Sequence, residues 1–312
     1  MFNKEKVLIN SRACIKVTGL GEYSLKDTLE CGQAFRYELV ESKEGYTEYI
    51  TVVGDIIIFV GQRQAGELLF FTDSDEDFER VIAPYFTLYT DYSAIAEDII
   101  SRTDSDWLKR AAESAKGIAI LGQNAWETLF SFIISQNNNI PRIRKIIRTL
   151  SAEYGENLAA KRGFEKCPLG KCEGAPRSEK CSGCGICYSF PKAEDVLSRP
   201  EGLLKANPGF RYRYLLSAAE RVCSGVTDLD AISSLSYSEA VEELKKVCGV
   251  GDKVASCVAL FGLSKLDAFP IDVWMKRAID TYFSGKLDPK SLGKYAGVAQ
   301  QYIFHYIRNL EN

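Results

Sequence analysis

The stretch Val247-Cys248-Gly249-Val250-Gly251-Asp252-Lys253 joins two segments of helical periodicity. Its glycines allow backbone conformations that other residues resist, and they let another molecule approach the main chain. The unpaired N–H groups at the start of the second helix carry the positive end of its dipole, which suits a phosphate. We therefore predict a helical hairpin over about residues 239–262, with Gly249, Val250 and Gly251 as its phosphate-binding turn. An ordinary turn between two helices is the alternative interpretation.

Helical patterns cover most of the chain after residue 92. Ser236 and Glu239 have the spacing of a capping box, and Asn124 and Glu127 repeat that spacing. Pro141 stands where a further helix would place its first residue. Apolar residues recur at helical spacing in four segments, namely 126–134, 143–150, 254–261 and about 293–309.

Before residue 93 the pattern is that of strands. Residues 47–53 and 56–60 are rich in β-branched and aromatic side chains, and Gly54-Asp55 separates them as a tight turn. Residues 67–72 and 14–17 are further candidate strands. The predicted fold class is therefore α+β. An N-terminal antiparallel β-sheet domain over residues 1–92 precedes a two-lobed, mainly α-helical body over residues 93–312, with the functional site between its lobes.

Composition and charge restrict the class of protein. The chain has 312 residues and a net charge of −3, and no apolar run approaches the ~20 residues that span a bilayer. Its first residues lack the apolar core of a signal peptide, so we expect neither membrane insertion nor secretion. A single histidine, His305, excludes a His dyad, a Ser-His-Asp triad and a multi-His metal site. A local positive surface is still expected from basic residues on one helix together with two on another segment: Arg142, Arg144, Lys145 and Arg148, and Arg211 and Arg213.

A cysteine-rich insertion is expected at about residues 164–190. Five of the ten cysteines lie there: Cys167, Cys172, Cys181, Cys184 and Cys187. In a chain without an export signal, this spacing favours metal binding over disulfides. Tetrahedral zinc needs four thiolates, and five are available. We favour a structural zinc ion, with an iron–sulfur cluster or no metal as the alternatives, because the last three cysteines also resemble part of a cluster ligand set.

Four motifs together resemble a known family. Lys253 is followed by Ala268-Phe269-Pro270-Ile271-Asp272-Val273-Trp274, and the chain also carries Cys31-Gly32-Gln33-Ala34-Phe35-Arg36 near its start. The run Ser131-Phe132-Ile133-Ile134-Ser135-Gln136-Asn137-Asn138-Asn139-Ile140 and the segment from Gly297 to Phe304 complete the set. The sequence resembles the helix-hairpin-helix, Gly/Pro-Asp superfamily of DNA glycosylases, and 8-oxoguanine DNA glycosylases most closely. The resemblance covers nearly the whole chain, in the family's order, except the cysteine-rich insertion.

The resemblance implies a lysine nucleophile. Lys253 would attack C1′ of the sugar, expel the damaged base and hold the sugar as a Schiff base, and β-elimination would then nick the strand. Asp272 would stabilise the cationic sugar and assist proton transfers. From the residues alone, Asp272 is also a good N-cap for the helix that follows it.

The resemblance also implies how the lesion and its partner are read. A flipped base would lie between Cys257 and Phe304, Gln300 would read its Watson–Crick edge, and the Gly32 carbonyl would accept the N7–H that guanine lacks. On the opposite strand, four residues would act at the cytosine that loses its partner: Asn137 fills the gap, Arg142 and Arg211 bond to the cytosine, and Phe210 wedges beside it. Family members often have tyrosine at the Phe210 position and histidine at that of Trp274.

The implied function is excision of 8-oxoguanine, preferably opposite cytosine, with associated strand nicking at the abasic site. The alternatives are a monofunctional alkyl-base glycosylase, which would lack the lysine, and a catalytically silent DNA-binding module. The expected partner is double-stranded DNA that contains oxidised guanine. We expect a monomer without an organic cofactor, in the cytoplasm at the nucleoid of a prokaryote.

Overall fold

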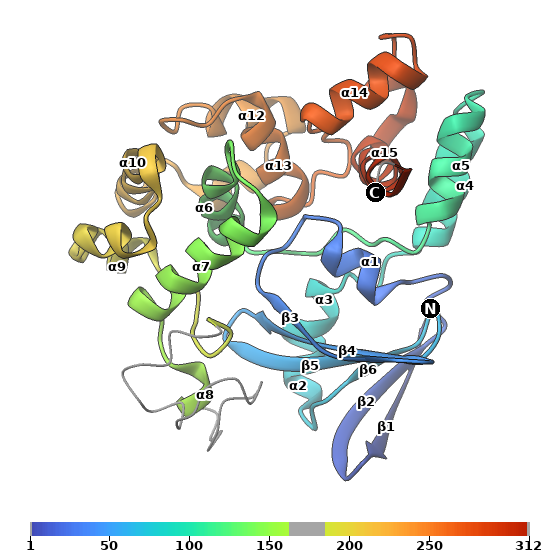
Figure 1. Ribbon diagram of the computed structural model, residues 1–312, viewed down its shortest axis with the longest axis horizontal. Coiled ribbons are helices and arrows are strands. Elements are labelled where there is room, and N and C mark those ends of the chain that lie inside the picture. Colours follow the sequence, from blue (N-terminus) through green and yellow to red (C-terminus); the bar gives the residue numbers. More distant parts are fainter. Residues whose placement is uncertain (1, 162–184, 311–312) are drawn as a thin grey trace.

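The computed structural model describes residues 2–161 and 185–310 and contains a six-stranded antiparallel sheet, drawn below a body of helices in Figure 1. The strands lie in the order β1-β2-β6-β5-β4-β3. Their bounds are β1 (Asn3–Ile9), β2 (Arg12–Thr18), β3 (Tyr37–Lys43), β4 (Tyr46–Val53), β5 (Ile56–Gln62) and β6 (Leu68–Phe70). The predicted α+β class is confirmed, and the four candidate strands correspond to β2, β4, β5 and β6. The sequence patterns did not reveal β1 and β3, which are the two edge strands and are mostly exposed.

Helices form the rest of the described chain. The first group in chain order is α1 (Leu25–Glu30), α2 (Asp75–Asp77), η1 (Phe78–Ile82), α3 (Ala83–Tyr85), α4 (Tyr92–Ser101) and α5 (Asp106–Ala115). The middle group is α6 (Ala125–Ser135), α7 (Ile140–Tyr154), α8 (Leu158–Lys161), α9 (Ala193–Ser198), η2 (Pro200–Ala206), η3 (Gly209–Arg211) and α10 (Tyr212–Cys223). The last group is α11 (Leu229–Ser233), α12 (Tyr237–Leu244), α13 (Asp252–Gly262), α14 (Val273–Tyr282), η4 (Pro289–Tyr295) and α15 (Ala296–Leu310).

Side-chain caps begin several of the helices. Ser236 and Glu239 form the complete capping box that their spacing predicts at α12. At α6 the Asn124 side chain accepts from the N–H of Glu127 at 3.0 Å, but the Glu127 carboxylate faces Arg36 instead of completing a box. Pro141 is the second residue of α7 rather than the first. Local sequence therefore fixes the helix starts, while tertiary partners decide where the capping carboxylates point.

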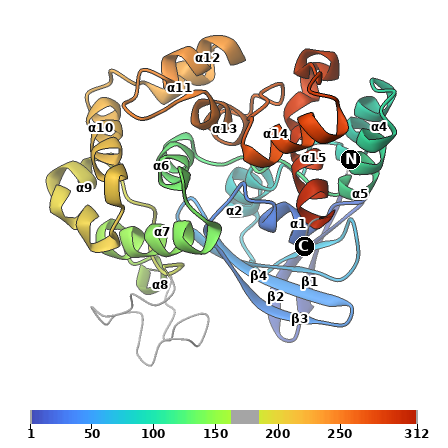
Figure 2. The same ribbon diagram turned by 45° about the horizontal axis from the view of Figure 1, so that its top comes forward.

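One continuous apolar core joins the sheet to the helical body. It runs from Ile15 in β2 to Ile307 in α15. Helix α13 packs against α6, and α15 packs against α5 and α14 (Figure 2). A second, smaller cluster is built from strand residues Ile50, Val52 and Ile57 with residues of α8 and the segment 186–187. Because the main core crosses residues 92 and 93, the domain boundary proposed there stays a prediction. None of the described helices has the length and apolar character that a membrane span requires.

Candidate active site

The turn between α12 and α13 has the geometry of the predicted hairpin. Gly249 has a φ of +80°, and a Cβ atom there would lie 2.4 Å from the Tyr214 ring, so only glycine fits. Gly251 is exposed at the N-cap of α13, and nothing lies within 4 Å of where its Cβ would be. Val250 is buried between them. Lys245 closes the turn through an ion pair of 2.8 Å with Asp252. The backbone at the start of α13 is thus open to an approaching molecule.

Lys253 is the second residue of α13, and its side chain lies on an aromatic surface. Its Nζ atom is 5.0 Å from the centre of the Phe132 ring in α6. Phe132 stacks on Phe261 at 5.5 Å and meets the edge of Phe35 at 5.6 Å. A ring face attracts a cation and restricts where it can lie. The predicted nucleophile therefore lies on a ring that is itself packed between side chains from two other parts of the chain.

Cys257 lies one helical turn after Lys253 and is buried. Burial raises the pKa of the Cys257 thiol, the Lys253 ammonium acts against that shift, and the Asp272 carboxylate adds to it. Both charged groups therefore lie close enough to act on the thiol. Asp272 accepts from the Met275 N–H at 2.8 Å and caps α14, as the sequence predicts. The predicted thiol thus lies within electrostatic reach of the predicted amine at the start of α13 and of the predicted carboxylate at the start of α14.

Gly32 and Phe304 meet although they lie far apart in the sequence. A Cβ atom on Gly32 would lie 3.7 Å from the Phe304 ring and 3.9 Å from Ile140. Phe304 is half-buried in α15, and the Arg308 guanidinium carbon lies 5.3 Å from its ring. Gln300, one turn earlier, is buried and accepts a hydrogen bond of 2.9 Å from Gln301. The residues predicted to read the base thus come from the loop after α1 and from one face of α15.

The four residues predicted to face the opposite strand also gather at one place. Arg211 is buried, and its guanidinium donates to the carbonyls of Gln136, Asn137 and Pro208, with the Nη2–Asn137 distance at 2.9 Å. The pKa of Arg211 is lowered mainly by burial and to a smaller extent by the positive charge of the nearby Arg142.

The other three residues that are predicted to face the opposite strand are exposed. Asn137 has a φ of +46° at the turn between α6 and α7, and Arg142 lies 3.5 Å from the Asn207 carbonyl. Phe210 is 48% exposed, and the Arg211 guanidinium carbon lies 4.5 Å from its ring. Arg211 therefore holds the asparagine turn and the Phe210 segment together.

Several contacts around the candidate site were missed by the sequence patterns. Phe132 was quoted only as part of a motif, and Gln33 and Arg36 had no role assigned. Arg36 is buried, pairs with Glu127 at 3.4 Å and donates to the Tyr188 carbonyl. Burial raises the pKa of Glu127. The signal that could have identified the contacts of Gln33 and Arg36 is their polar character within a motif of otherwise small or apolar residues.

The predicted basic surface on α7 needs a correction. Arg144 pairs with Glu38 of β3 at 3.2 Å, and Arg148 pairs with the same carboxylate. Arg144 also lies over the Tyr37 ring, with 4.3 Å between its guanidinium carbon and the ring centre. These two arginines fasten α7 to the sheet, so they do not form a free positive patch with Arg142.

The cysteine-rich insertion falls mostly outside the described residues. Cys167, Cys172, Cys181 and Cys184 are all in that part of the chain. Cys187 is described and is buried in the smaller core cluster, where its carbonyl accepts from the N–H of Leu158 at 2.8 Å. Within residues 2–161 and 185–310 no group of three or more metal-binding side chains occurs.

Comparisons with known proteins agree with this arrangement. Residues 17–129 match the family model described as 8-oxoguanine DNA glycosylase, N-terminal domain. The N-glycosylase/DNA lyase of Saccharomyces cerevisiae is 26% identical over 276 residues, which cover 82% of this chain and 67% of the yeast protein. A probable N-glycosylase/DNA lyase of Methanothermobacter thermautotrophicus is 24% identical over 303 residues, covering 93% and 95%.

Solved structures resemble the whole chain. MBOgg1 in complex with a low-affinity DNA ligand superimposes with a TM-score of 0.82 at 32% identity and covers both chains fully. The Clostridium acetobutylicum 8-oxoguanine glycosylase/lyase, bound to double-stranded DNA with cytosine opposite 8-oxoguanine, gives a TM-score of 0.79 at 31% identity, covering 100% and 99%. A 3-methyladenine DNA glycosylase from Archaeoglobus fulgidus shares the fold, with a TM-score of 0.65 at 16% identity.

Proposed function

The chain belongs to the 8-oxoguanine DNA glycosylase family, and on that basis we propose that Lys253 is the nucleophile with which it excises the lesion. Its activity is that of an N-glycosylase/DNA lyase of base-excision repair. The observation that supports the lysine mechanism best is that Cys257 lies within electrostatic reach of both Lys253 at the start of α13 and Asp272 at the start of α14. A monofunctional alkyl-base glycosylase would need no amine at this position.

The proposed chemistry starts from the neutral amine of Lys253. Its nitrogen lone pair attacks C1′ of the sugar, and the electrons of the N-glycosidic bond leave with the base, which takes up a proton. The sugar ring then opens to give a C1′–nitrogen Schiff base. Loss of a C2′ proton expels the 3′ phosphate and breaks the strand. The negative charge of the Asp272 carboxylate stabilises the positive charge on the sugar. Its hydrogen bond as the α14 cap fixes the orientation of the carboxylate.

Lesion recognition is proposed to rest on the Gly32 carbonyl. 8-Oxoguanine carries an N7–H donor, whereas guanine presents an N7 acceptor that would face the carbonyl oxygen and leave both acceptors unpaired. The proximity of Gly32 to Phe304 supports this, because a base stacked on Phe304 would lie near the Gly32 main chain. Cys257 would close the other side of the base, and Gln300 would bond to its Watson–Crick edge.

Preference for cytosine opposite the lesion is the next part of the proposal. Arg142 and Arg211 would bond to cytosine acceptors, with Asn137 in the gap and Phe210 as an apolar wedge. Support comes from the exposure of Asn137, Arg142 and Phe210 around one turn. Arg211 is buried behind them and would have to exchange a bond to a main-chain carbonyl for one to the cytosine. Excision rates opposite cytosine, adenine, thymine and guanine test this directly. Arg142→Ala should narrow the differences between them, and an unchanged preference would contradict the role of Arg142.

The two activities can be separated in one experiment. A duplex with a single 8-oxoguanine opposite cytosine is incubated with the protein, and strand breaks are counted with and without hot alkali. Breaks without alkali report the lyase, whereas breaks that need alkali report base removal alone. The proposal predicts both, while a monofunctional enzyme would give only the second kind and a silent DNA-binding module neither.

Three further proposals rest on the sequence. The cysteines of the insertion would hold a structural zinc ion, which elemental analysis of the purified protein and the melting temperature of a Cys181→Ser/Cys184→Ser variant would test. An iron–sulfur cluster would instead give visible absorbance.

We also propose that the protein acts as a monomer on double-stranded DNA containing oxidised guanine, and that it works at the nucleoid of a prokaryotic cell.

A further inference from the structure

The loop after α1 presents Gly32 to the base-reading residues. Gly32 has a φ of +86°, a conformation that favours glycine, and its α-carbon faces Phe304 and Ile140. Among residues 2–161 and 185–310, no hydrogen bond ends on the Gly32 carbonyl. That oxygen is therefore available as an acceptor. The proposed function needs it to lie within hydrogen-bond range of N7–H, so its position must be fixed by neighbouring residues.

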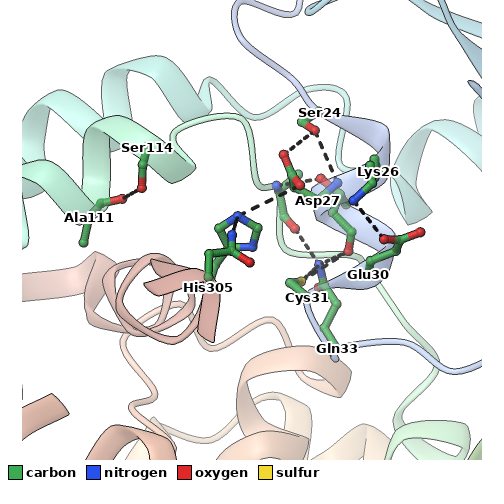
Figure 3. Close-up of polar contacts among 12 residues, drawn as sticks. Ser24, Lys26, Asp27, Glu30, Cys31, Gln33, Ala111, Ser114 and His305 are labelled. Carbon is green, nitrogen blue, oxygen red and sulfur yellow. Dashed lines mark hydrogen bonds and ion pairs between the residues drawn. The ribbon is translucent and has the colours of Figure 1, made fainter. Parts of the chain in front are cut away.

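Gln33, the next residue, is fully buried and its carboxamide is fully engaged. Its Nε2 donates to the carbonyls of Thr28 at 2.8 Å and Ala119 at 2.7 Å, and its Oε1 accepts from the Leu121 N–H at 2.8 Å. Nε2 also lies 3.3 Å from Cys31 Sγ. Figure 3 shows Gln33 below Cys31 at the end of α1, with its hydrogen bonds drawn as dashed lines. One side chain thus ties the Gly32 loop to a segment almost ninety residues away in the sequence.

That distant segment also contacts the helix of the nucleophile. The Gln123 side chain donates to the Gln33 carbonyl at 2.9 Å, and the Gln123 N–H donates to the Phe261 carbonyl at 3.3 Å. Phe261 belongs to α13, which carries Lys253 and Cys257. Gln123 therefore links the residue beside Gly32 to the last turn of the helix that carries the amine and the thiol.

We infer that Gln33 is a positioning residue for lesion recognition: it holds the Gly32 carbonyl at a fixed place relative to α13. The inference rests on the proposed role of Gly32. A hydrogen bond weakens steeply when its geometry is lost, and discrimination of 8-oxoguanine from guanine depends on this one contact. Loss of the Gln33 hydrogen bonds should therefore free the Gly32 loop and slow base excision. Nicking of an abasic site should be little affected, because that reaction needs Lys253 but no contact with a base.

The test compares two reactions in each variant. Base release is measured from a duplex with 8-oxoguanine opposite cytosine, and nicking from a duplex with a preformed abasic site, both with enzyme in saturating excess and below the melting temperature. Gln33→Met removes the carboxamide at similar volume. Gln62→Met is the matched control, because Gln62 also binds backbone of the α1 region, through Leu25 N–H at 2.8 Å and the Tyr23 carbonyl at 2.7 Å.

Gln33→Met should lower base release roughly tenfold to a hundredfold and leave abasic-site nicking within about threefold of the wild type. Gln62→Met should leave the ratio of the two rates unchanged. The inference would be overturned if the ratio of base release to abasic-site nicking in Gln33→Met equals that of the wild type, whether both rates fall equally or neither falls. If Gln33→Met does not fold, Gln123→Met removes the hydrogen bond to the Gln33 carbonyl and should shift the ratio in the same direction; no shift overturns the inference. Failure of the proposed function appears separately, as a wild type that releases no 8-oxoguanine.

Discussion

The Nζ atom of Lys253 lies 5.0 Å from the centre of the Phe132 ring, so the proposed nucleophile is held on the face of an aromatic side chain. Such a contact contributes about 0.5–2 kcal/mol and restricts where the amine can lie. Phe132→Leu should therefore lower the rate of Schiff-base formation roughly tenfold in single-turnover trapping. Phe130→Leu is the control, because Phe130 is buried in the same helix but packs against Trp126 and Phe190. Equal losses of rate in both variants would contradict a positioning role.

Asp272 has two roles that substitution can separate. Asparagine caps a helix about as well as aspartate, so Asp272→Asn should keep the melting temperature close to that of the wild type. It removes the negative charge beside the sugar, and base release should fall roughly a hundredfold to a thousandfold. Asp272→Ala loses the cap as well and should cost about 1 kcal/mol of stability. An active Asp272→Asn variant would show that the residue acts only as a cap.

The two glycines of the hairpin should respond differently to alanine. Gly249→Ala forces a side chain into the left-handed region and against the Tyr214 ring, which should cost about 2 kcal/mol or more in thermal or urea unfolding. Gly251→Ala meets no neighbouring atom, so stability should stay within about 0.5 kcal/mol of the wild type. Its methyl group should instead weaken binding to an uncleavable lesion duplex, as measured by fluorescence anisotropy. Full affinity in Gly251→Ala would argue against DNA contact at this turn.

His305 predicts a pH dependence of stability. Its imidazole lies 4.0 Å from the Asp27 carboxylate (Figure 3). It also lies 2.8 Å from the Asn309 side chain. Burial lowers the pKa of His305 from 6.5, Asp27 opposes that shift, and Lys26 and Arg308 add to it. The unfolded chain therefore takes up this proton first as the pH falls, so stability declines below about pH 6.5 until the folded form is also protonated.

His305→Gln isolates this effect, because His305 is the single histidine of the chain. Melting temperatures of the two proteins are compared between pH 7.5 and pH 5. The wild type should lose more stability than the variant as the pH falls below about 6.5. Parallel curves would mean that the imidazole titrates alike in the folded and unfolded chain.

Features set by neighbouring residues were predictable from sequence. The caps at Ser236 and Asp272 and the hairpin around Gly249 depend on local spacing, and the structure confirms their geometry. Strands β1 and β3 were not predicted, because these edge strands lack the apolar alternation of the inner strands. The motif residues could be named from the resemblance. The structure places them in local groups: Cys257 near Lys253 and Asp272, Gly32 near Phe304, and Arg211 with Asn137 and Phe210.

Contacts between distant segments could not be read from sequence. Nothing near Gln33 indicates that its carboxamide binds backbone at Ala119 and Leu121, and nothing near Lys253 indicates Phe132 as its neighbour. Arg144 was expected to face DNA because it shares a helix with Arg142, yet Glu38 of an unpredicted strand pairs with it. A charged residue's partner depends on which strand the fold places beside it.

The central claim is that Lys253 forms the covalent bond to the sugar. A duplex with one 8-oxoguanine opposite cytosine is incubated with borohydride and with the wild type, Lys253→Gln or Lys192→Gln. Lys192 is an exposed lysine that pairs with Glu156. A covalent protein–DNA band with the wild type and Lys192→Gln, and none with Lys253→Gln, is the predicted result. A band of undiminished strength with Lys253→Gln, or base release by the wild type without any band, would contradict the lysine mechanism.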